Sequence, residues 1–371
     1  MIDPTLRQKV EQAAHLAAQR SKRVDLAGWM DRLKAAAKSP SLAERLELAR
    51  SHRWAGAIPN WEPVDLTKKA DVHPLDVIGV DGSQIYPREH GPVKWTYIQA
   101  VAYRKLVHPL FESSFFDIGT LLANCSQAGS EISEEIMENR DELMALTNAW
   151  RTLMEMRLAN RASRENPGAL TILDNGLLPW LSVSGQSAQK QLKDYLENFL
   201  GIRPGLIAGV ISGPQSHLLA RLVTLIESET VEKGLREEQA ILDMSLMRHH
   251  LEPGERSALF LHGSPRNQVF QDFGAGVFFF FLRVNRNEIV RVEIPEWVVE
   301  DPQSIDLVHA TILADALPTG YSYVLSQAHQ HVVVPMEIAT MMHSVESSSF
   351  LAESGKVPYA SGKTNFKRAK S

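Results

Sequence analysis

Runs of apolar residues separated by turn residues predict short β-strands between residues 76 and 116. The first strand is expected at Asp76–Asp81, the second at Lys94–Arg104 and a third at Val107–Phe116. The segment between the first two is rich in proline and glycine, which favours a turn. This pattern indicates the beginning of a β-sheet.

The periodicity becomes helical from Ser130 to about Ala162, because apolar side chains return to one face of a helix. The sequence Asn166-Pro167-Gly168 ends this helix, and a strand is expected at Ala169–Asp174. Three strands followed by a long helix and another strand fit a ribonuclease H-like sheet. The same order also fits other α/β folds.

The remainder of the chain alternates helices and strands. Residues 1 to about 60 are expected to be helical, and a proline-rich connector follows at Trp61–Pro74. We predict an N-terminal helical region with its connector at 1–75, one large domain at 76–350 and a basic tail at 351–371. The later elements are helices at Ala188–Leu200, Ser216–Glu229, Ser304–Ala316 and about Tyr323 to His331, with strands at Leu206–Ile211, Ala258–His262, Gly276–Val284 and Ile289–Ile294.

Composition excludes several classes of protein. Of 371 residues, 44% are hydrophobic and 22% charged, which is ordinary for a globular chain and excludes fibrous and disordered classes. The longest apolar run, around Val277–Leu282, is far shorter than the ~20 residues that cross a bilayer. The N-terminus lacks a basic start followed by an apolar stretch, so we expect a cytoplasmic protein without membrane contact.

The single cysteine, Cys125, excludes an internal disulfide and a multi-cysteine zinc site. The net charge of -5 argues against a generally basic coat that would bind nucleic acid. Contact with DNA would therefore need a local positive channel.

Two carboxylates stand where predicted strands end. Asp81 follows an apolar run and precedes Gly82, and Asp174 precedes Asn175-Gly176 in the same way. A strand fixes its last side chain, and two such acids on neighbouring strands could hold a divalent cation through hard oxygen ligands. The alternative is that both acids only serve the turns, by hydrogen bonding to their own backbone.

A third acid is expected from the long helix, and two glutamates compete for the position. Glu155 lies 19 residues before Asp174, whereas Glu142 flanks the apolar stripe more closely. The two are 13 residues apart, about 20 Å along a helix, so only one can reach the site.

Five blocks of sequence occur in the order found in the NurA nucleases, and the chain resembles that family from about Asp76 to about Glu346. Glu155 is similar to the family's helical glutamate, and the C-terminal block supplies Tyr321 and His329. The five blocks are Asp81-Gly82-Ser83, Leu173-Asp174, Gly254-Glu255-Arg256-Ser257, Val290–Val298 and Gly320–His329.

The resemblance implies an α/β fold with a ribonuclease H-like mixed sheet flanked by helices. It also implies a manganese-dependent nuclease that works on DNA ends, usually as a dimer docked on a hexameric HerA-type DNA-translocating ATPase. The cofactor would be Mn²⁺ or Mg²⁺, with two ions about 4 Å apart to activate water and to relieve charge on the leaving oxygen.

In this interpretation Asp81 bridges both ions, and Asp174, Glu155 and His329 are further ligands. His329 could alternatively shuttle a proton, since the ordinary pKa of imidazole is near working pH. Tyr321 is expected to position a phosphate or to order His329 through its hydroxyl. Glu155 and Tyr321 are thus counted with the two aspartates and His329 among the catalytic residues.

Two departures from the family pattern affect these expectations. Asn175 stands where the family commonly has glycine after the second aspartate, although asparagine also tolerates left-handed geometry. The segment Gly209–Gly213 lacks an expected lysine, which puts a phosphate or water contact in question. Arg256 and Arg291 could bind phosphate bidentately or form ion pairs with Glu255 and Glu293.

Three functions fit the sequence. The first is a divalent-metal-dependent DNA exo- and endonuclease that acts on single- or double-stranded ends with a HerA-type hexamer. The second is a catalytically inactive ribonuclease H-like adaptor that binds DNA or regulates a translocase. The third is a metal-dependent phosphohydrolase of small substrates.

Overall fold

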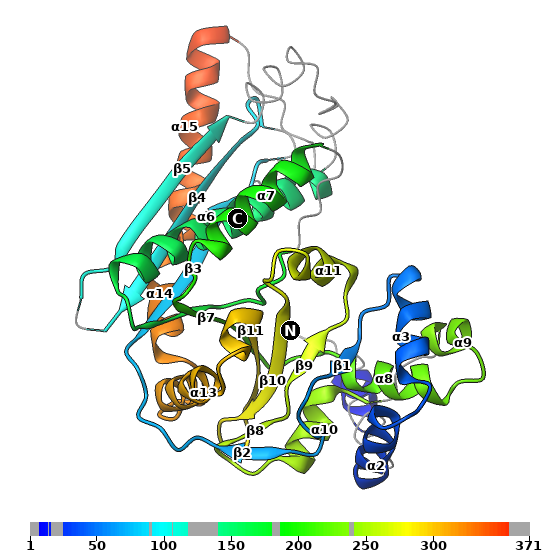
Figure 1. Cartoon of the computed structure of the whole chain (residues 1–371). Coiled ribbons are helices and arrows are strands. Elements are labelled where there is room, and N and C mark those ends of the chain that lie inside the picture. Colours follow the sequence, from blue (N-terminus) through cyan, green and yellow to red (C-terminus); the bar gives the residue numbers. More distant parts are fainter. Residues whose placement is uncertain are drawn as a thin grey trace. The chain divides into compact units, whose positions relative to one another are not determined.

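The computed structural model describes residues 7–13, 15, 25–88, 91–105, 107–117, 140–179, 186–236 and 241–355 (Figure 1). The chain forms two compact units that interleave along the sequence. The first comprises Met1–Lys69, Ser212–Val269 and Phe278–Arg291, and the second comprises Ala70–Ile211, Phe270–Val277 and Val292–Ser371. The division at residues 75 and 350 drawn from the sequence remains a prediction about domains. Cys125 and residues 356–371 of the basic tail lie outside the described residues.

The first unit packs helices against short strands. Its core joins side chains of α2 (Leu26–Ala37) and α8 (Leu218–Glu227) to the phenylalanines of β10 (Val277–Arg283). A buried ion pair, Arg256 with Glu62 at 3.0 Å, lies in the same unit. Its elements are α2 (Leu26–Ala37), α3 (Leu42–Ser51), α8 (Leu218–Glu227), α9 (Val231–Arg236), α10 (Asp243–His250), β1 (Ala57–Pro59), β2 (Thr67–Lys69), β8 (Glu255–Ser257) and β9 (Phe260–His262).

Three of these strands, β1, β2 and β8, were not predicted. The helices expected in the N-terminal region are confirmed by α2 and α3, but β1 and β2 lie in and just before the segment interpreted as a connector. Each has only three residues and is held by a partner about 200 positions later, because β1 pairs with β9 and β2 pairs with β8. Local sequence carries no signal for such long-range pairing.

The sequence boundaries between the two units fall within three elements: α11 (Pro265–Gln271), β10 (Val277–Arg283) and β11 (Ile289–Pro295). The second unit then contributes five strands in the spatial order β7-β6-β3-β4-β5. They are β3 (Val77–Ile85), β4 (Trp95–Arg104), β5 (Leu110–Asp117), β6 (Leu170–Leu173) and β7 (Leu206–Ser212).

The sheet of the second unit is mixed. Strands β3, β4 and β5 are antiparallel neighbours, whereas β6 and β7 run parallel to β3. Three antiparallel strands, the long helix α6 (Arg140–Glu165) and two parallel strands give the order that the sequence predicted for a ribonuclease H-like sheet. The predicted mixed sheet flanked by helices is therefore confirmed.

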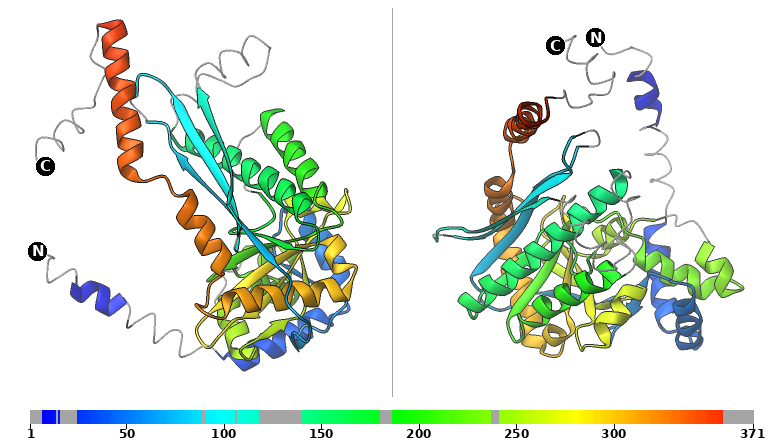
Figure 2. Two further views of the ribbon diagram at one scale, coloured as in Figure 1. Left: turned by 90° about the vertical axis from the view of Figure 1, so that its left-hand side faces the viewer. Right: turned by 90° about the horizontal axis from the view of Figure 1, so that it is seen from above.

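Helices cover both faces of this sheet (Figure 2). A Cβ atom placed on Gly79 would lie 2.7 Å from the backbone of Val324 in α14 (Tyr323–Val332), whereas one on Gly82 would meet Arg151 and Glu155 of α6. Residues three apart on a strand point to opposite faces, so α14 covers one face and α6 the other. The unit also contains α7 (Gln186–Leu200), α12 (Glu296–Val299), α13 (Pro302–Ala316) and α15 (Met336–Ser354).

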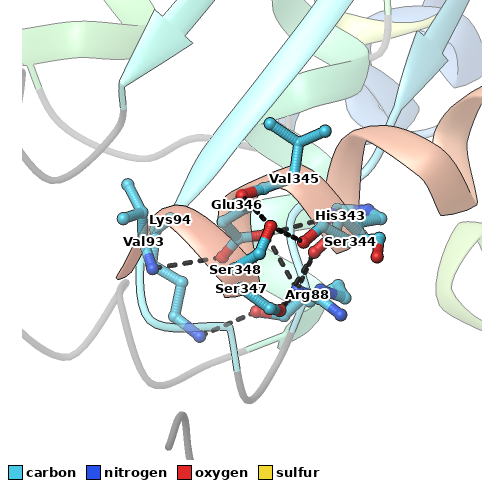
Figure 3. A network of polar contacts seen from close by, with 9 residues as sticks. All are labelled: Arg88, Val93, Lys94, His343, Ser344, Val345, Glu346, Ser347 and Ser348. Atoms are coloured by element: carbon cyan, nitrogen blue, oxygen red, sulfur yellow. Dashed lines mark hydrogen bonds and ion pairs between the residues drawn. The ribbon is translucent and has the colours of Figure 1, made fainter. Parts of the chain in front are cut away.

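Helix α15 was not predicted, and polar contacts attach it to the turn between β3 and β4 (Figure 3). None of its residues is buried. The guanidinium of Arg88 donates to the Glu346 carboxylate at 2.9 Å and to the His343 carbonyl at 2.9 Å. The His343 ring packs at 4.8 Å from that of Trp95. Among the described residues, no helix combines the length and apolar character needed to cross a membrane.

Replacing Gly79 by alanine should destabilise the protein by about 1–3 kcal/mol, because the added methyl would meet backbone atoms that cannot move aside. Chemical denaturation measures the change in the free energy of unfolding. Gly201→Ala is the matched control, since its methyl would meet only the mobile end of Asn160. Equal stability of the Gly79→Ala protein and the wild type would contradict the tight seating of α14 on β3.

Candidate acidic site at the end of strand β6

Asp81 and Asp174 lie side by side on neighbouring parallel strands. Val80 is in register with Leu173, so the residue that follows each of them is one of the two aspartates. Adjacent strands are about 4.8 Å apart, which brings the two aspartates next to each other where β6 ends. The sequence pattern alone had suggested this neighbourhood.

The prediction that Asp81 ends its strand is wrong. Strand β3 continues to Ile85, because β4 still pairs with it after β6 has ended at Leu173. Asp81 is therefore held inside a strand, opposite Val101, and only Asp174 leaves a strand end. The end of β6 opens the sheet next to Asp81, which is why further side chains can approach it.

The carboxylate of Asp81 is buried, with 7% of the residue exposed. Its Oδ1 accepts a hydrogen bond from the backbone N–H of Gly82 at 2.8 Å, and its Oδ2 lies 2.8 Å from Nδ1 of His329. The His329 side chain is 62% exposed. One imidazole thus connects a buried acid to solvent.

Glu155 lies on the opposite face of the sheet, in the space that Gly82 leaves, where the charges of Asp81 and Asp174 act on it. A Cβ atom on Gly82 would lie 2.4 Å from Oε1 of Glu155. Glu155 is buried, and its Oε1 has no hydrogen-bond partner. Glu142, the alternative considered from the sequence, is exposed in the first turn of α6. The structure therefore brings Glu155 to Asp81, and Glu142 lies elsewhere.

Burial raises the pKa of Glu155 from the ordinary 4.5 to about 7. The negative charges of Asp81 and Asp174 raise it further, while the guanidinium of Arg151 opposes this rise. Nε of Arg151 lies 3.4 Å from Oε1 of Glu155, and the two residues, four apart on α6, form an ion pair. Since each acid acts on the pKa of Glu155, the three carboxylates form one electrostatic cluster.

Tyr321 belongs to the same cluster through Asp174. Burial raises the pKa of Asp174, and the hydrogen bond from the Tyr321 side chain opposes that rise. The pKa of Tyr321 is itself raised by burial, so its hydroxyl stays protonated and donates. The Tyr321 hydroxyl is thus hydrogen-bonded to Asp174, and its contact with a phosphate stays a prediction.

The local structure of α14 places Tyr321 and His329. The hydroxyl of Ser322 caps the helix by accepting from the backbone N–H of Leu325 at 3.2 Å, so Tyr321 stands just outside the first turn. His329 lies in the last turn, and the N–H of Val334 beyond the helix donates to Ser83 of β3 at 3.3 Å. Both ends of α14 are thus fixed relative to Asp81.

The turn after Asp174 is fixed by close packing. The buried carboxylate of Glu293 accepts from the N–H of Leu177 at 2.8 Å, and a Cβ on Gly176 would lie 2.7 Å from the same carboxylate. The sequence Asn175-Gly176 departs from the family pattern. Close packing against Glu293 explains its glycine, because a side chain at Gly176 would collide with that carboxylate. Glu293 therefore stabilises this turn by accepting a hydrogen bond from its backbone.

A side-chain contact is shown for each of the two arginines considered as phosphate ligands. Arg256 is buried in its ion pair with Glu62, so its partner is neither phosphate nor the neighbouring Glu255. The Arg291 guanidinium lies 5.8 Å from the centre of the Phe279 ring. Sequence reasoning missed Arg151, although its position four residues before Glu155 is the spacing of a helical ion pair.

The cluster has the chemistry of a divalent-cation site. Carboxylate oxygens are the ligands that hard cations prefer, and Oε1 of buried Glu155, which has only the 3.4 Å ion pair with Arg151, lacks the hydrogen bond that a buried polar atom normally makes. No three His, Cys, Asp or Glu side chains in the described part of the chain already stand in ligating geometry. A cation would have to draw these acids closer together.

Comparisons with known proteins show what the chain is similar to. A family model described as the NurA domain matches residues 75–334. The crystal structure of the NurA nuclease from Sulfolobus solfataricus is similar with a TM-score of 0.54 and 11% identity, over 95% of this chain and 98% of that one. The catalytic domain of human Endonuclease V gives a TM-score of 0.31 and 13% identity, over 79% of this chain and 97% of that one. No curated protein matches the sequence.

Glu155→Gln should stabilise the metal-free protein at pH 8 and lose this advantage near pH 4. Because the folded state raises the pKa of Glu155 from 4.5 to about 7, folding is favoured at low pH and weakened as pH rises between those values. At about 1.4 kcal/mol per pH unit, the difference reaches about 3 kcal/mol. Thermal unfolding across this pH range measures it, and a constant difference at all pH values would contradict the assignment.

Gly82→Ala should weaken Mn²⁺ binding roughly 10-fold. The new methyl would meet Oε1 and Cγ of Glu155 and Cγ of Arg151, so both side chains must shift, at some cost in stability, and the Glu155 carboxylate is displaced. Calorimetric titration with Mn²⁺ measures the affinity, and the melting temperature reports the fold. Unchanged Mn²⁺ affinity would show that Glu155 has no part in holding a cation.

Proposed function

The chain belongs to the NurA family, and we propose on this premise that it is a divalent-metal-dependent nuclease that hydrolyses DNA phosphodiester bonds. The observation that supports this most directly is the cluster of Asp81, Asp174 and Glu155. Its three carboxylates come from β3, from the end of β6 and from α6; the charges of Asp81 and Asp174 raise the pKa of Glu155, and the charge of Asp81 raises that of Asp174. The whole cluster lies within the residues that the family model matches.

The three carboxylates would hold Mn²⁺ or Mg²⁺, and we propose two ions. Bound divalent cations supply an activated water and offset the charge of the phosphate in such reactions. The raised pKa of Glu155 means that a proton competes for this carboxylate near neutral pH, so cation binding should tighten as pH rises through about 7. Arg151 reduces the mutual repulsion of the acids when no cation is bound.

His329 is suited to move a proton. When Nδ1 donates its hydrogen to Oδ2 of Asp81, the neutral ring presents Nε2 as an acceptor. The large exposed fraction of the side chain gives this ring access to water. Asp81 would then orient the imidazole in one tautomer, and Nε2 would take a proton from the attacking water or return one to the leaving oxygen.

Tyr321 acts on Asp174 in this proposal. A phenol hydroxyl that donates to one carboxylate oxygen fixes the rotation of the carboxylate and leaves the other oxygen for a ligand. Its role is therefore to position Asp174.

The partners follow from family membership alone. We propose that the protein acts on DNA ends, single-stranded or double-stranded, as a homodimer with a HerA-type hexameric ATPase. An adaptor that binds DNA without cleaving it is the second candidate, because Gly209–Gly213 lacks the lysine expected of an active member.

The full chain should degrade labelled DNA with Mn²⁺, and Asp81→Asn or Glu155→Gln should reduce the rate roughly 100-fold or more, because each removes a carboxylate charge from the cluster. Glu142→Gln is the matched control, since it removes an exposed charge from the same helix and should cleave at the wild-type rate. Cleavage by all three variants at equal rates would exclude the site. A wild-type protein that binds DNA but cleaves none with either metal would favour the adaptor.

A further inference from the structure

Four aromatic side chains gather beside α14 on the second unit. The ring of His331 is stacked on that of Tyr103 at 5.6 Å with an interplanar angle of 19°. Phe111 meets His331 edge-on at 6.5 Å, and Tyr323 meets Tyr103 edge-on at 6.4 Å. These four residues, from β4, β5 and α14, are called the aromatic platform.

The platform packs on buried side chains through Tyr103, and its other rings are exposed to solvent. Tyr103 packs on a small buried cluster of Val101, Ala328 and Val332, and its side chain is hydrogen-bonded to Tyr323. Phe111 nevertheless exposes 54% of its surface, and Tyr323 and His331 are also exposed. Ordered aromatic rings that stay in contact with water are a feature of sites that bind other molecules by stacking.

The platform lies in the same row of the sheet as the acidic site. Asp81 is in register with Val101, and Val101 is in register with Phe111. Directly paired residues point to the same face, and three adjacent strands place Phe111 about 10 Å from Asp81. In a strand stacked as in a duplex, this distance corresponds to about three steps of 3.4 Å.

The last turn of α14 contributes to both places. His329 contacts Asp81, and His331, two residues later, stacks on Tyr103. The acidic neighbour of Phe111, Glu112, alternates to the other face of the sheet, where its charge acts on Arg161 of α6. No carboxylate of β5 within the described side chains therefore lies beside Phe111 to repel a phosphate backbone.

We propose that the aromatic platform stacks a nucleobase of single-stranded DNA whose cleaved phosphate lies at Asp81. This inference rests on the proposed nuclease function and specifies its substrate. Stacking on an aromatic side chain requires a base with a free face, which single strands offer and paired duplexes do not. The contact would be tolerant of sequence, since every base has such a face.

Phe111 variants in an Asp81→Asn background test the platform, because binding is then measured without cleavage. The probes are a 20-nucleotide single strand containing 2-aminopurine and the same strand in a duplex. Phe111→Ala should weaken single-strand binding about 5-fold to 100-fold and reduce the quenching of 2-aminopurine, with duplex affinity unchanged. Phe273→Ala, at a residue 56% exposed, is the matched control and should bind as its parent does.

Two further variants separate stacking from packing. Phe111→Tyr should bind the single strand as the parent does, whereas Phe111→Leu, which keeps apolar bulk without a ring, should bind as weakly as Phe111→Ala. Parental binding by the leucine variant, or equal losses for single strand and duplex, would overturn the platform. Cleavage by the protein with Asp81 intact is measured separately, so absence of nuclease activity would be distinguishable from absence of stacking.

Discussion

The mutual repulsion of three partly or wholly buried carboxylates is the constraint on which the second unit depends. Asp81 is fixed in β3 by its pairing with β4, Asp174 follows the last residue of β6, and Glu155 enters past Gly82 from the opposite face. No single element could place these charges together. The parallel register, the early end of β6 and a glycine without a side chain are all required.

Three side chains, each in contact with one of the acids, offset part of this repulsion. Arg151 forms an ion pair with Glu155, Tyr321 donates to Asp174, and His329 contacts Asp81. Each acid thus keeps one partner, yet Oε1 of Glu155 accepts no hydrogen bond and its carboxyl has a raised pKa. A site that is incompletely neutralised by its own residues costs stability, and such cost is characteristic of sites that bind a cation.

Sequence patterns predicted part of this arrangement. Apolar runs followed by Asp-Gly or Asp-Asn-Gly located both aspartates, and helical periodicity located α6. The continuation of β3 past Asp81 was missed, because it depends on β4 as a partner. The choice between Glu142 and Glu155 could not be made from periodicity, since both flank the apolar stripe and only the opening at Gly82 selects Glu155. Strand β1 was missed because its partner is β9, far along the chain.

Anomalous diffraction from a crystal soaked in Mn²⁺ tests the central claim most directly. The account predicts a manganese peak within coordination distance of the carboxylates of Asp81 and Asp174, with Oε1 of Glu155 turned toward it. A fully occupied manganese peak elsewhere, with the three carboxylates uncoordinated and unmoved, would contradict it.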